Sequence, residues 1–590
     1  PLSLDMTSLT VPLALPFWAA GGLLAAQLLC AKRTGKPLRC WVKKHKMSPE
    51  TVFLCSFALS AVGYVLALAL LLTGCAQLVD LTQRLAENRD EQLEQLARQG
   101  KTREPFSQMT YTRPDMEAFQ ALAEESCRLG QTSEDVDQIL EQTTQLYEAY
   151  DRFYTMLSLA DIYYCKDLSN AEAQAEYEFC TGQSGQVEQA LEAYYQALAQ
   201  GPAVEELEEY FGEGFFDGYT GESQWDAAFL DLWNQEQEAV ARYYEAMNQL
   251  ADASYEDMEK NLGPILVELI GLRQELAAQF GMDYEQMQYS FYFERDYTPE
   301  QAAQYVADIR NYMVPVYEEV MEASPYDDIY YDYLDEDELI GVLGSVTELM
   351  GGDVKAAFDF MTKYELCDVS VNSSKAAMSF QTYLENYEAP FLFLDPYGDT
   401  EDILTFSHEF GHYVDAFVNY NAGETIDMSE CYSQAMEYLA LGYYDEVLGE
   451  DEADNLRRMK LLDTLDLYVQ QASFAEFEST VYSMDPDQLS AEVLNDLSLQ
   501  LARDYGYCDE SRAKYYAMSW SDIAHFFEYP FYVITYPVSN DIAMQIYELS
   551  QDGGTAGLDK YNELLSREYT GFLDNIEEAG FVSPFESGRV

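Results

Sequence analysis

Residues 408–412 read His-Glu-Phe-Gly-His, and this pentapeptide constrains the fold more than any other part of the 590-residue chain. Residues four apart lie on one face of an α-helix, so His408 and His412 can bind one metal ion, with Glu409 beside them. Apolar residues recur at helical spacing around the pentapeptide: Ile403, Leu404, Phe406, Phe410, Val414, Phe417 and Val418. The sequence therefore predicts an amphipathic helix that buries its metal-binding face.

Two imidazoles leave a tetrahedral Zn²⁺ short of one protein ligand and a water. The metzincin arrangement would place glycine at position 415 and histidine at 418, but this chain has Asp415 and Val418. A carboxylate from a second helix is the other common solution. Glu430 is the best candidate, because it opens the run Glu-Cys-Tyr-Ser-Gln-Ala-Met-Glu at the start of an apolar, helically spaced stretch.

Three further carboxylates lie near this ligand. Glu437 is two turns beyond Glu430 on the same predicted face, where it is expected to orient a ligand or the bound water. Glu424 and Asp427 are competing ligands in the preceding loop, but loops hold metal ligands less firmly than helices do.

A short β-sheet is predicted just ahead of the metal-binding helix. Residues 377–383 and 391–394 alternate or run apolar and are bounded by Pro390 and by Asp395-Pro396. An open edge of such a sheet can pair with an extended peptide, and Phe380 and Tyr383 are the candidate substrate contacts there. A purely structural hairpin is the alternative.

The rest of the body is predicted to be helical, so the fold class is mainly α. Helices are expected at about 132–165, 186–199, 222–252, 255–280 and 298–322, after a polar stalk helix at 78–96. The expected separators are residues 182–185, Gly201-Pro202 and Thr298-Pro299. This gives three regions: a membrane leader at 1–75, a helical N-terminal region at 76–366 and a catalytic region at 367–590.

The leader contains two uncharged apolar stretches, residues 11–31 and 52–72, each long enough to span a bilayer. All seven basic residues of the leader lie between them, which predicts that this loop is cytoplasmic and that the body is extracytoplasmic. The second stretch ends Leu72-Thr73-Gly74-Cys75, which resembles the lipobox of bacterial lipoproteins. The leader therefore predicts either a lipidated Cys75 or a membrane anchor of two helices.

Acidic residues dominate the body. Residues 1–75 hold seven of the 33 Lys and Arg residues but only two of the 105 Asp and Glu residues, so the remainder is strongly negative. Such a charge repels nucleic acid, which is excluded as a partner, and it either maintains solubility or attracts cationic peptides.

The cysteines form no metal or redox motif. No Cys-x-x-Cys pair occurs anywhere in the chain. Cys165 and Cys180 are close enough in sequence to bridge two helices, but buried free thiols are expected because the spacings form no disulfide framework.

The pentapeptide followed by Glu-x-x-Ser-x-x-Met-Glu resembles the thimet oligopeptidase and oligoendopeptidase F family of zinc metallopeptidases. The similarity covers about residues 230–590 and extends through Leu272, Arg273, residues 295–297, Lys375, residues 390–392 and residues 525–536. The resemblance implies a mostly helical, two-lobed body with a small antiparallel sheet beside the metal helix. It also implies a deep channel that admits oligopeptides and excludes folded proteins.

The same resemblance assigns roles to individual residues. His408, His412 and Glu430 match the ligands of a single zinc ion, and Glu409 matches the general base. The segment from His525 matches one that contacts the substrate and stabilises the oxyanion.

Three tyrosines follow His525 within this segment. Tyr532 and Tyr536 are the preferred hydroxyl donors to the oxyanion, and Tyr529 is a substrate contact. Without the resemblance, His525 would more often be a histidine of the core.

Together these features predict an extracytoplasmic, membrane-anchored zinc endopeptidase that cuts internal bonds of oligopeptides. The main alternative is a catalytically silent peptide-binding surface lipoprotein. A third possibility, an acidic helical scaffold at the cell surface, would bind no metal.

Overall fold

Helices form most of the chain that the structure, a computed structural model, describes: residues 104–212, 214–220, 227–250, 254–420, 425–551, 554–567 and 569–590. The expected leader, Cys75, the stalk helix and Glu424 lie outside these residues. Among the described helices, none combines the length and apolar character needed to cross a membrane. The expectation of a mainly α fold with a small sheet is confirmed.

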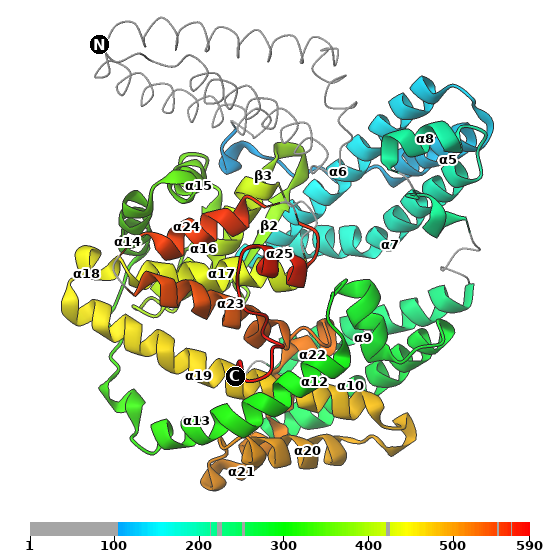
Figure 1. Ribbon diagram of the computed structural model, residues 1–590. Helices are drawn as coiled ribbons and strands as arrows, with labels where there is room; N and C mark the ends of the chain where they lie inside the picture. The colour runs from blue at the N-terminus through cyan, green and yellow to red at the C-terminus, as the bar shows by residue number, and fades with distance from the viewer. Residues whose placement is uncertain are drawn as a thin grey trace, which may run out of the picture.

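The first helices form an arm at the upper right of Figure 1. They are α5 (Met116–Thr132), α6 (Val136–Lys166), α7 (Ala171–Ala199) and α8 (Val204–Phe211). Their apolar faces form a separate buried cluster that includes Phe119, Ile139, Leu146 and Val187. Cys165 and Cys180, on α6 and α7, are both free thiols.

The break expected at residues 182–185 is wrong, because α7 runs through it without interruption. Gly182 and Gly185 are exposed, and a Cβ at either would meet nothing within 4 Å. Each glycine costs a helix about 1 kcal/mol relative to alanine. Buried Cys180 and Val187 hold the helix on its neighbours and outweigh that cost.

The next helices are α9 (Ala227–Leu250), α10 (Tyr255–Gln279), α11 (Tyr284–Met287), α12 (Pro299–Asp308) and α13 (Val314–Met321). The single helix expected at 298–322 is therefore two helices, joined by a π-helical turn at Ile309–Met313. Pro315, near the start of α13, has no N–H to donate, which favours this local change of hydrogen bonding.

The sheet follows α14 (Glu336–Met350) and α15 (Gly352–Lys363) and has the order β1-β3-β2. Strand β2 (Phe380–Leu384) pairs antiparallel with β3 (Ala389–Phe393), as expected. Strand β1 (Cys367–Asp368) pairs parallel with β3, so the sheet is mixed rather than purely antiparallel. Every residue of β3 is buried, and this strand packs against the helix that carries the pentapeptide.

Ten α-helices follow the sheet in the described part of the chain. They are α16 (Asp402–Asn419), α17 (Ile426–Leu441), α18 (Tyr444–Val447), α19 (Glu450–Ser483), α20 (Ala491–Asp504), α21 (Ala513–Met518), α22 (Ala524–Glu528), α23 (Thr535–Ser550), α24 (Ala556–Leu565) and α25 (Phe572–Glu578). Helix α17 is buried along nearly its whole length between α16 and α23 (Figure 1). The larger apolar cluster joins residues on both sides of the boundary predicted at 366, for example Leu343 and Phe391.

Candidate metal centre

Helix α16 carries both histidines of the pentapeptide on one face. The side chains of Phe406, Phe410 and Val414 are buried and hold the opposite face in the core. The carboxylate of Asp402 accepts hydrogen bonds from the backbone N–H groups of residues 397–399, which fixes the turn into the helix. The imidazole centroids of His408 and His412 lie 5.0 Å apart.

Gly411 lets α17 approach this face closely. A Cβ at Gly411 would lie 2.5 Å from the Cα of Ser433 and 2.6 Å from the carbonyl oxygen of Tyr432. Only a residue without a side chain fits against the α17 backbone there. The two helices are therefore close enough for Glu430 to face both imidazoles.

Glu430 lies between the two histidines. Its Oε2 is 3.5 Å from His408 Nε2, and its Oε1 is 3.8 Å from His412 Nε2. Ligand atoms of these three residues all lie within 4.8 Å of one another, and among the described residues they form the one such group of His, Cys, Asp or Glu. The nitrogen, nitrogen and oxygen donor set is one that zinc prefers.

The other imidazole nitrogens are already occupied. His408 Nδ1 is 2.9 Å from Glu437 Oε1, and His412 Nδ1 is 3.0 Å from Ser429 Oγ. Such bonds hold a metal-binding imidazole in the tautomer that leaves Nε2 free. The three residues therefore fit a metal ion, because both Nε2 atoms turn toward the same carboxylate.

The electrostatics of the site also favour a cation. Burial lowers the pKa of His412 to about 4, so this imidazole is neutral, as a metal ligand must be. Burial alone would lower the pKa of His408, but the bond to Glu437 and the charge of Glu430 raise it. The carboxylates that favour a proton on His408 would equally favour a divalent ion. Burial also raises the pKa of Glu409 to about 7, although nearby His408 opposes the shift.

A buried lysine completes the chain of contacts behind His408. Lys460 of α19 lies with its Nζ 2.6 Å from Glu437 Oε2, and both side chains are less than a tenth exposed. Burial would raise the pKa of Glu437, but the charges of Lys460 and His408 lower it. No sequence pattern pointed to Lys460, because it lies on another helix and follows Glu437 at no recognisable spacing.

Of the competing carboxylates, Asp427 is engaged elsewhere. It lies in the first turn of α17, not in a loop, and its side chain is fully buried. Its two oxygens accept hydrogen bonds from Arg295 Nε and from the hydroxyl of Tyr297.

The segment from His525 to Tyr536 lies against the metal group. The hydroxyl of Tyr532 donates to Glu430 Oε1 at 2.7 Å, and the hydroxyl of Tyr536 is 3.3 Å from His525 Nε2. The ring of Tyr532 lies 4.9 Å from the imidazole of His525, centroid to centroid. Tyr529 is the exposed member of the segment, at 46%.

The two predicted substrate contacts lie on β2, which packs against α16. Phe380 stacks on Phe393 of β3 at 5.0 Å between ring centroids. Tyr383 is buried, and its hydroxyl has no hydrogen-bond partner among the described residues.

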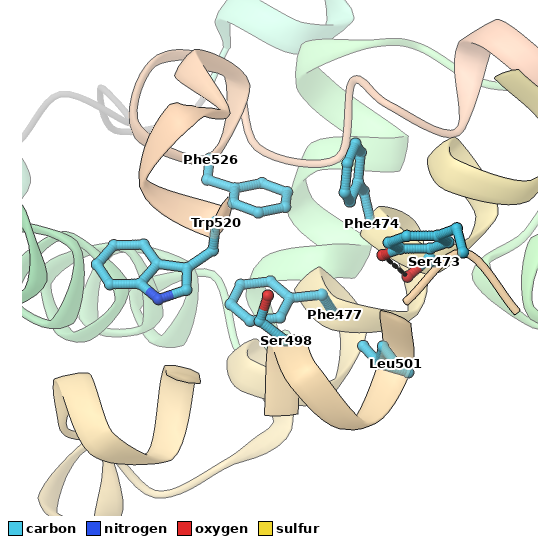
Figure 2. Close-up of a pocket in the computed structure, with 8 residues that line it drawn as sticks. Ser473, Phe474, Phe477, Ser498, Leu501, Trp520 and Phe526 are labelled. Atoms are coloured by element: carbon cyan, nitrogen blue, oxygen red, sulfur yellow. Dashed lines mark hydrogen bonds between the residues drawn. The ribbon is translucent and has the colours of Figure 1, made fainter. Parts of the chain in front are cut away.

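A small cavity lies behind the His525 segment, between α19, α20 and α22 (Figure 2). Phe526 points into it and stacks on Phe477 at 4.9 Å between ring centroids, with Trp520 and Phe474 nearby. None of its lining residues belongs to the metal group. Phe526 forms part of the wall of this cavity and follows His525 on α22.

Two parts of the chain match known protein families. Residues 106–224 match the peptidase M3 N-terminal domain, and residues 354–569 match peptidase family M3. No curated protein shows a significant sequence match.

Several solved structures share the fold. PZ peptidase A with an inhibitor is 20% identical and has a TM-score of 0.69, over 82% of this chain and 96% of its own. A structure assigned as an oligoendopeptidase F is 21% identical with a TM-score of 0.71, over 82% and 96%. Oligoendopeptidase-F from Enterococcus faecium is 15% identical with a TM-score of 0.52, over 80% and 95%. At these identities the likeness establishes the fold alone.

Proposed function

Because the chain belongs to peptidase family M3 and is a metallopeptidase, we propose that it is a zinc-dependent endopeptidase that hydrolyses internal bonds of oligopeptides outside the cytoplasm. The observation that carries the proposal is the convergence of His408 Nε2, His412 Nε2 and the Glu430 carboxylate, with Glu409 on the same helix. One Zn²⁺ held by these three residues would supply Lewis acidity and lower the pKa of water at the site.

The protein's own groups account for the proton transfers. Glu409, with a pKa near 7, takes a proton from the attacking water and later delivers it to the leaving amine. Glu437 and Ser429 hold the imidazoles in place throughout, because each bonds an Nδ1 atom.

The hydroxyls of Tyr532 and Tyr536, together with His525, serve the developing oxyanion. Each such donor contributes about 3 kcal/mol to transition-state stabilisation in other enzymes. Their contacts with Glu430 and with each other support this role, because they place the donors beside the metal group.

Oligopeptides are the proposed substrates, as the names of the structurally similar oligoendopeptidases suggest. An extended peptide would add to the outer edge of β2. Ser158 of α6 donates to the carbonyl oxygen of Tyr383 on that edge, so the peptide would pair beside Phe380 and Gln381. Exposed Tyr529 would contact the peptide nearer His525.

The extracytoplasmic location rests on the sequence of residues 1–75. Their two apolar stretches, the basic loop between them and the lipobox-like end at Cys75 favour a membrane anchor. Mass spectrometry of the mature N-terminus tests this directly: a diacylglycerol on Cys75 indicates a lipoprotein, and an intact leader in the membrane fraction indicates two spanning helices. An unmodified protein in the cytoplasmic fraction would overturn the location.

Metal content measured together with peptide turnover tests the function. We expect about one zinc per full-length chain, cleavage of a mixed oligopeptide library at internal bonds, and loss of cleavage in Glu409→Gln with zinc retained. Glu401→Gln, the same exchange at the entrance to α16, serves as the matched control and should keep activity. Zinc binding without cleavage would indicate the silent peptide-binding lipoprotein, and a metal-free chain would refute the proposal.

A further inference from the structure

A buried aromatic residue with a left-handed backbone precedes Tyr532. Phe531 has φ = 67° and is 2% exposed. This conformation is costly for a bulky residue and persists only where surrounding contacts impose it. Its N–H donates to Glu478 Oε1 at 2.8 Å, and its carbonyl oxygen accepts from Arg295 Nη2 at 2.9 Å. A buried carboxyl group and a guanidinium from two distant segments therefore hold the strained turn.

Arg295 also binds the helix that carries Glu430. Its Nε donates to Asp427 Oδ2 at 3.3 Å, and Asp427 lies one turn before Glu430 on α17. Its Nη2 donates to Thr535 Oγ1 at 2.7 Å, at the start of α23. The side chains of Arg295 and Asp427 are both fully buried. One guanidinium thus joins α17 to both ends of the turn that contains Tyr532.

Aromatic rings fix the guanidinium itself. The Arg295 carbon Cζ lies 4.5 Å from the ring centroid of Tyr289 and 4.4 Å from that of Phe293. Tyr297 donates to the second oxygen of Asp427 at 2.9 Å, which orients the carboxylate toward Arg295. Stacking and a planar fork of donors are properties of arginine that lysine does not share.

The other end of the segment is held separately. Arg273 of α10 donates from Nη1 to the carbonyl oxygen of Phe526 at 3.1 Å, and the ring of Phe526 lines the cavity of Figure 2. Arg273 also bonds Glu236 of α9, Tyr482 of α19 and the carbonyl oxygen of Phe527, and so fixes where the segment begins. The far end of the segment is joined to α17 directly, because Gln434 Nε2 donates to the carbonyl oxygen of Tyr536. Arg295 adds a second link, from Asp427 to the turn at Phe531.

We propose that Arg295 is a positioning residue, which sets the place of the Tyr532 hydroxyl relative to Glu430 by binding the elements that carry both. The proposal rests on the peptidase function proposed above. Arg295 lies in the core and acts only through Asp427, Phe531 and Thr535. Arg295→Lys keeps the positive charge beside Asp427, but one ammonium on a flexible stem does not reproduce the two-sided fork.

A double-mutant cycle on the full-length chain separates positioning from general stability. The variants are Arg295→Lys, Tyr532→Phe and the pair, with an internally quenched fluorescent oligopeptide as the substrate. We expect Arg295→Lys to lower kcat by about 10- to 100-fold and Tyr532→Phe by about 100-fold, with KM and zinc content close to wild type. The double variant should be no more than about twofold below Tyr532→Phe alone, because the hydroxyl that Arg295 positions is already missing.

Arg310→Lys is the matched control. Arg310 pairs with Glu476 and Asp504 and is 36% exposed, so the same exchange there should leave kcat unchanged. Thr535→Val is a milder variant in case Arg295→Lys fails to fold, since it removes one bond to Arg295 and keeps the buried ion pair. It should lower kcat by a smaller factor that again disappears in the Tyr532→Phe background.

Hydrogen exchange of the metal-free proteins gives a readout independent of turnover. Amides of residues 525–536 should exchange faster in Arg295→Lys than in wild type or Arg310→Lys. Losses in kcat that multiply in the double variant, or unchanged exchange in this segment, would overturn the proposal. A wild-type chain that binds zinc but cleaves no peptide would instead reject the proposed function.

Discussion

Replacing Gly411 by alanine should push α16 and α17 apart at the metal group. The new Cβ would lie 2.5 Å from the Cα of Ser433 and 2.6 Å from the carbonyl oxygen of Tyr432. Ordinary carbon contacts are about 3.5–4.0 Å, so the helices must separate by about 1 Å. Both obstructing atoms belong to the backbone of a buried helix and cannot rotate aside.

Two energies oppose each other in this substitution. Overpacking of this kind costs about 1–3 kcal/mol, whereas alanine gains about 1 kcal/mol over glycine within a helix. We therefore expect the free energy of unfolding of the metal-free protein to fall by about 1 kcal/mol, and at most by about 2 kcal/mol. The chain should remain folded, which allows its metal binding to be measured.

Zinc affinity should fall much more than stability. Metal–ligand distances tolerate deviations of about 0.2 Å, and a displacement of Glu430 by about 1 Å from His408 and His412 exceeds that tolerance. We expect the zinc affinity to fall at least about 100-fold. Competition with a chromogenic chelator measures the affinity, and urea unfolding in excess chelator measures the stability.

Gly185→Ala is the matched control for this substitution. Gly185 lies within α7, and a Cβ there meets nothing within 4 Å. The control should keep wild-type zinc affinity and gain up to about 1 kcal/mol of stability. Wild-type zinc affinity in a folded Gly411→Ala variant would refute the inference that the close helix approach places Glu430.

Three further outcomes follow from the contacts around the site. Glu437→Gln should lower the zinc affinity by about 10- to 100-fold, because it weakens the bond to His408 Nδ1 and leaves Lys460 without its ion pair. Competition with a chelator measures the affinity, and an unchanged affinity would contradict this prediction. Zinc at about 1,000 times its dissociation constant should stabilise the fold by about 4 kcal/mol. Removal of the zinc by a chelator should therefore lower Tm in a calorimetric scan. An unchanged Tm would show that zinc does not bind the native state. Burial raises the pKa of Glu478 to about 8, so the folded protein holds a proton that the unfolded chain has lost above its ordinary pKa of 4.5. Glu478 should therefore make the free energy of unfolding fall as pH rises from about 5 to 8, by at most about 1.4 kcal/mol per pH unit. Urea titrations at several pH values should show a smaller dependence of this free energy on pH in Glu478→Gln. The same dependence in the variant and the wild type would refute the prediction.

Short-range sequence patterns predicted the helices and strands whose formation depends on the spacing of apolar residues. The apolar spacing around residues 408–412 predicted a helix, and α16 spans Asp402–Asn419. The short apolar runs bounded by proline predicted strands, and β2 and β3 lie there. Glu430 was identified because it begins an apolar helical stretch, and the structure brings it to both histidines.

Contacts between distant segments were beyond these patterns. Gly182 and Gly185 predicted a break, but packing on neighbouring helices carried α7 through it. The parallel partner of β3 was missed because a two-residue strand, Cys367–Asp368, has no periodicity to detect. The role of Gly411 was missed for a related reason, since it depends on which helix packs against it.

Buried basic side chains are difficult to identify from the sequence of a chain this acidic. Four basic side chains are buried among the described residues, namely Arg273, Arg295, Lys375 and Lys460, and each lies within 4 Å of a buried carboxylate. A buried ion pair adds little net stability, because desolvation offsets the attraction, but its geometry is strict. Two of these pairs, Arg295 with Asp427 and Lys460 with Glu437, anchor residues of α17, the helix that carries Glu430. The amino-acid composition shows only a large net negative charge, whereas the geometry of the site depends on a few basic side chains that are buried in the fold.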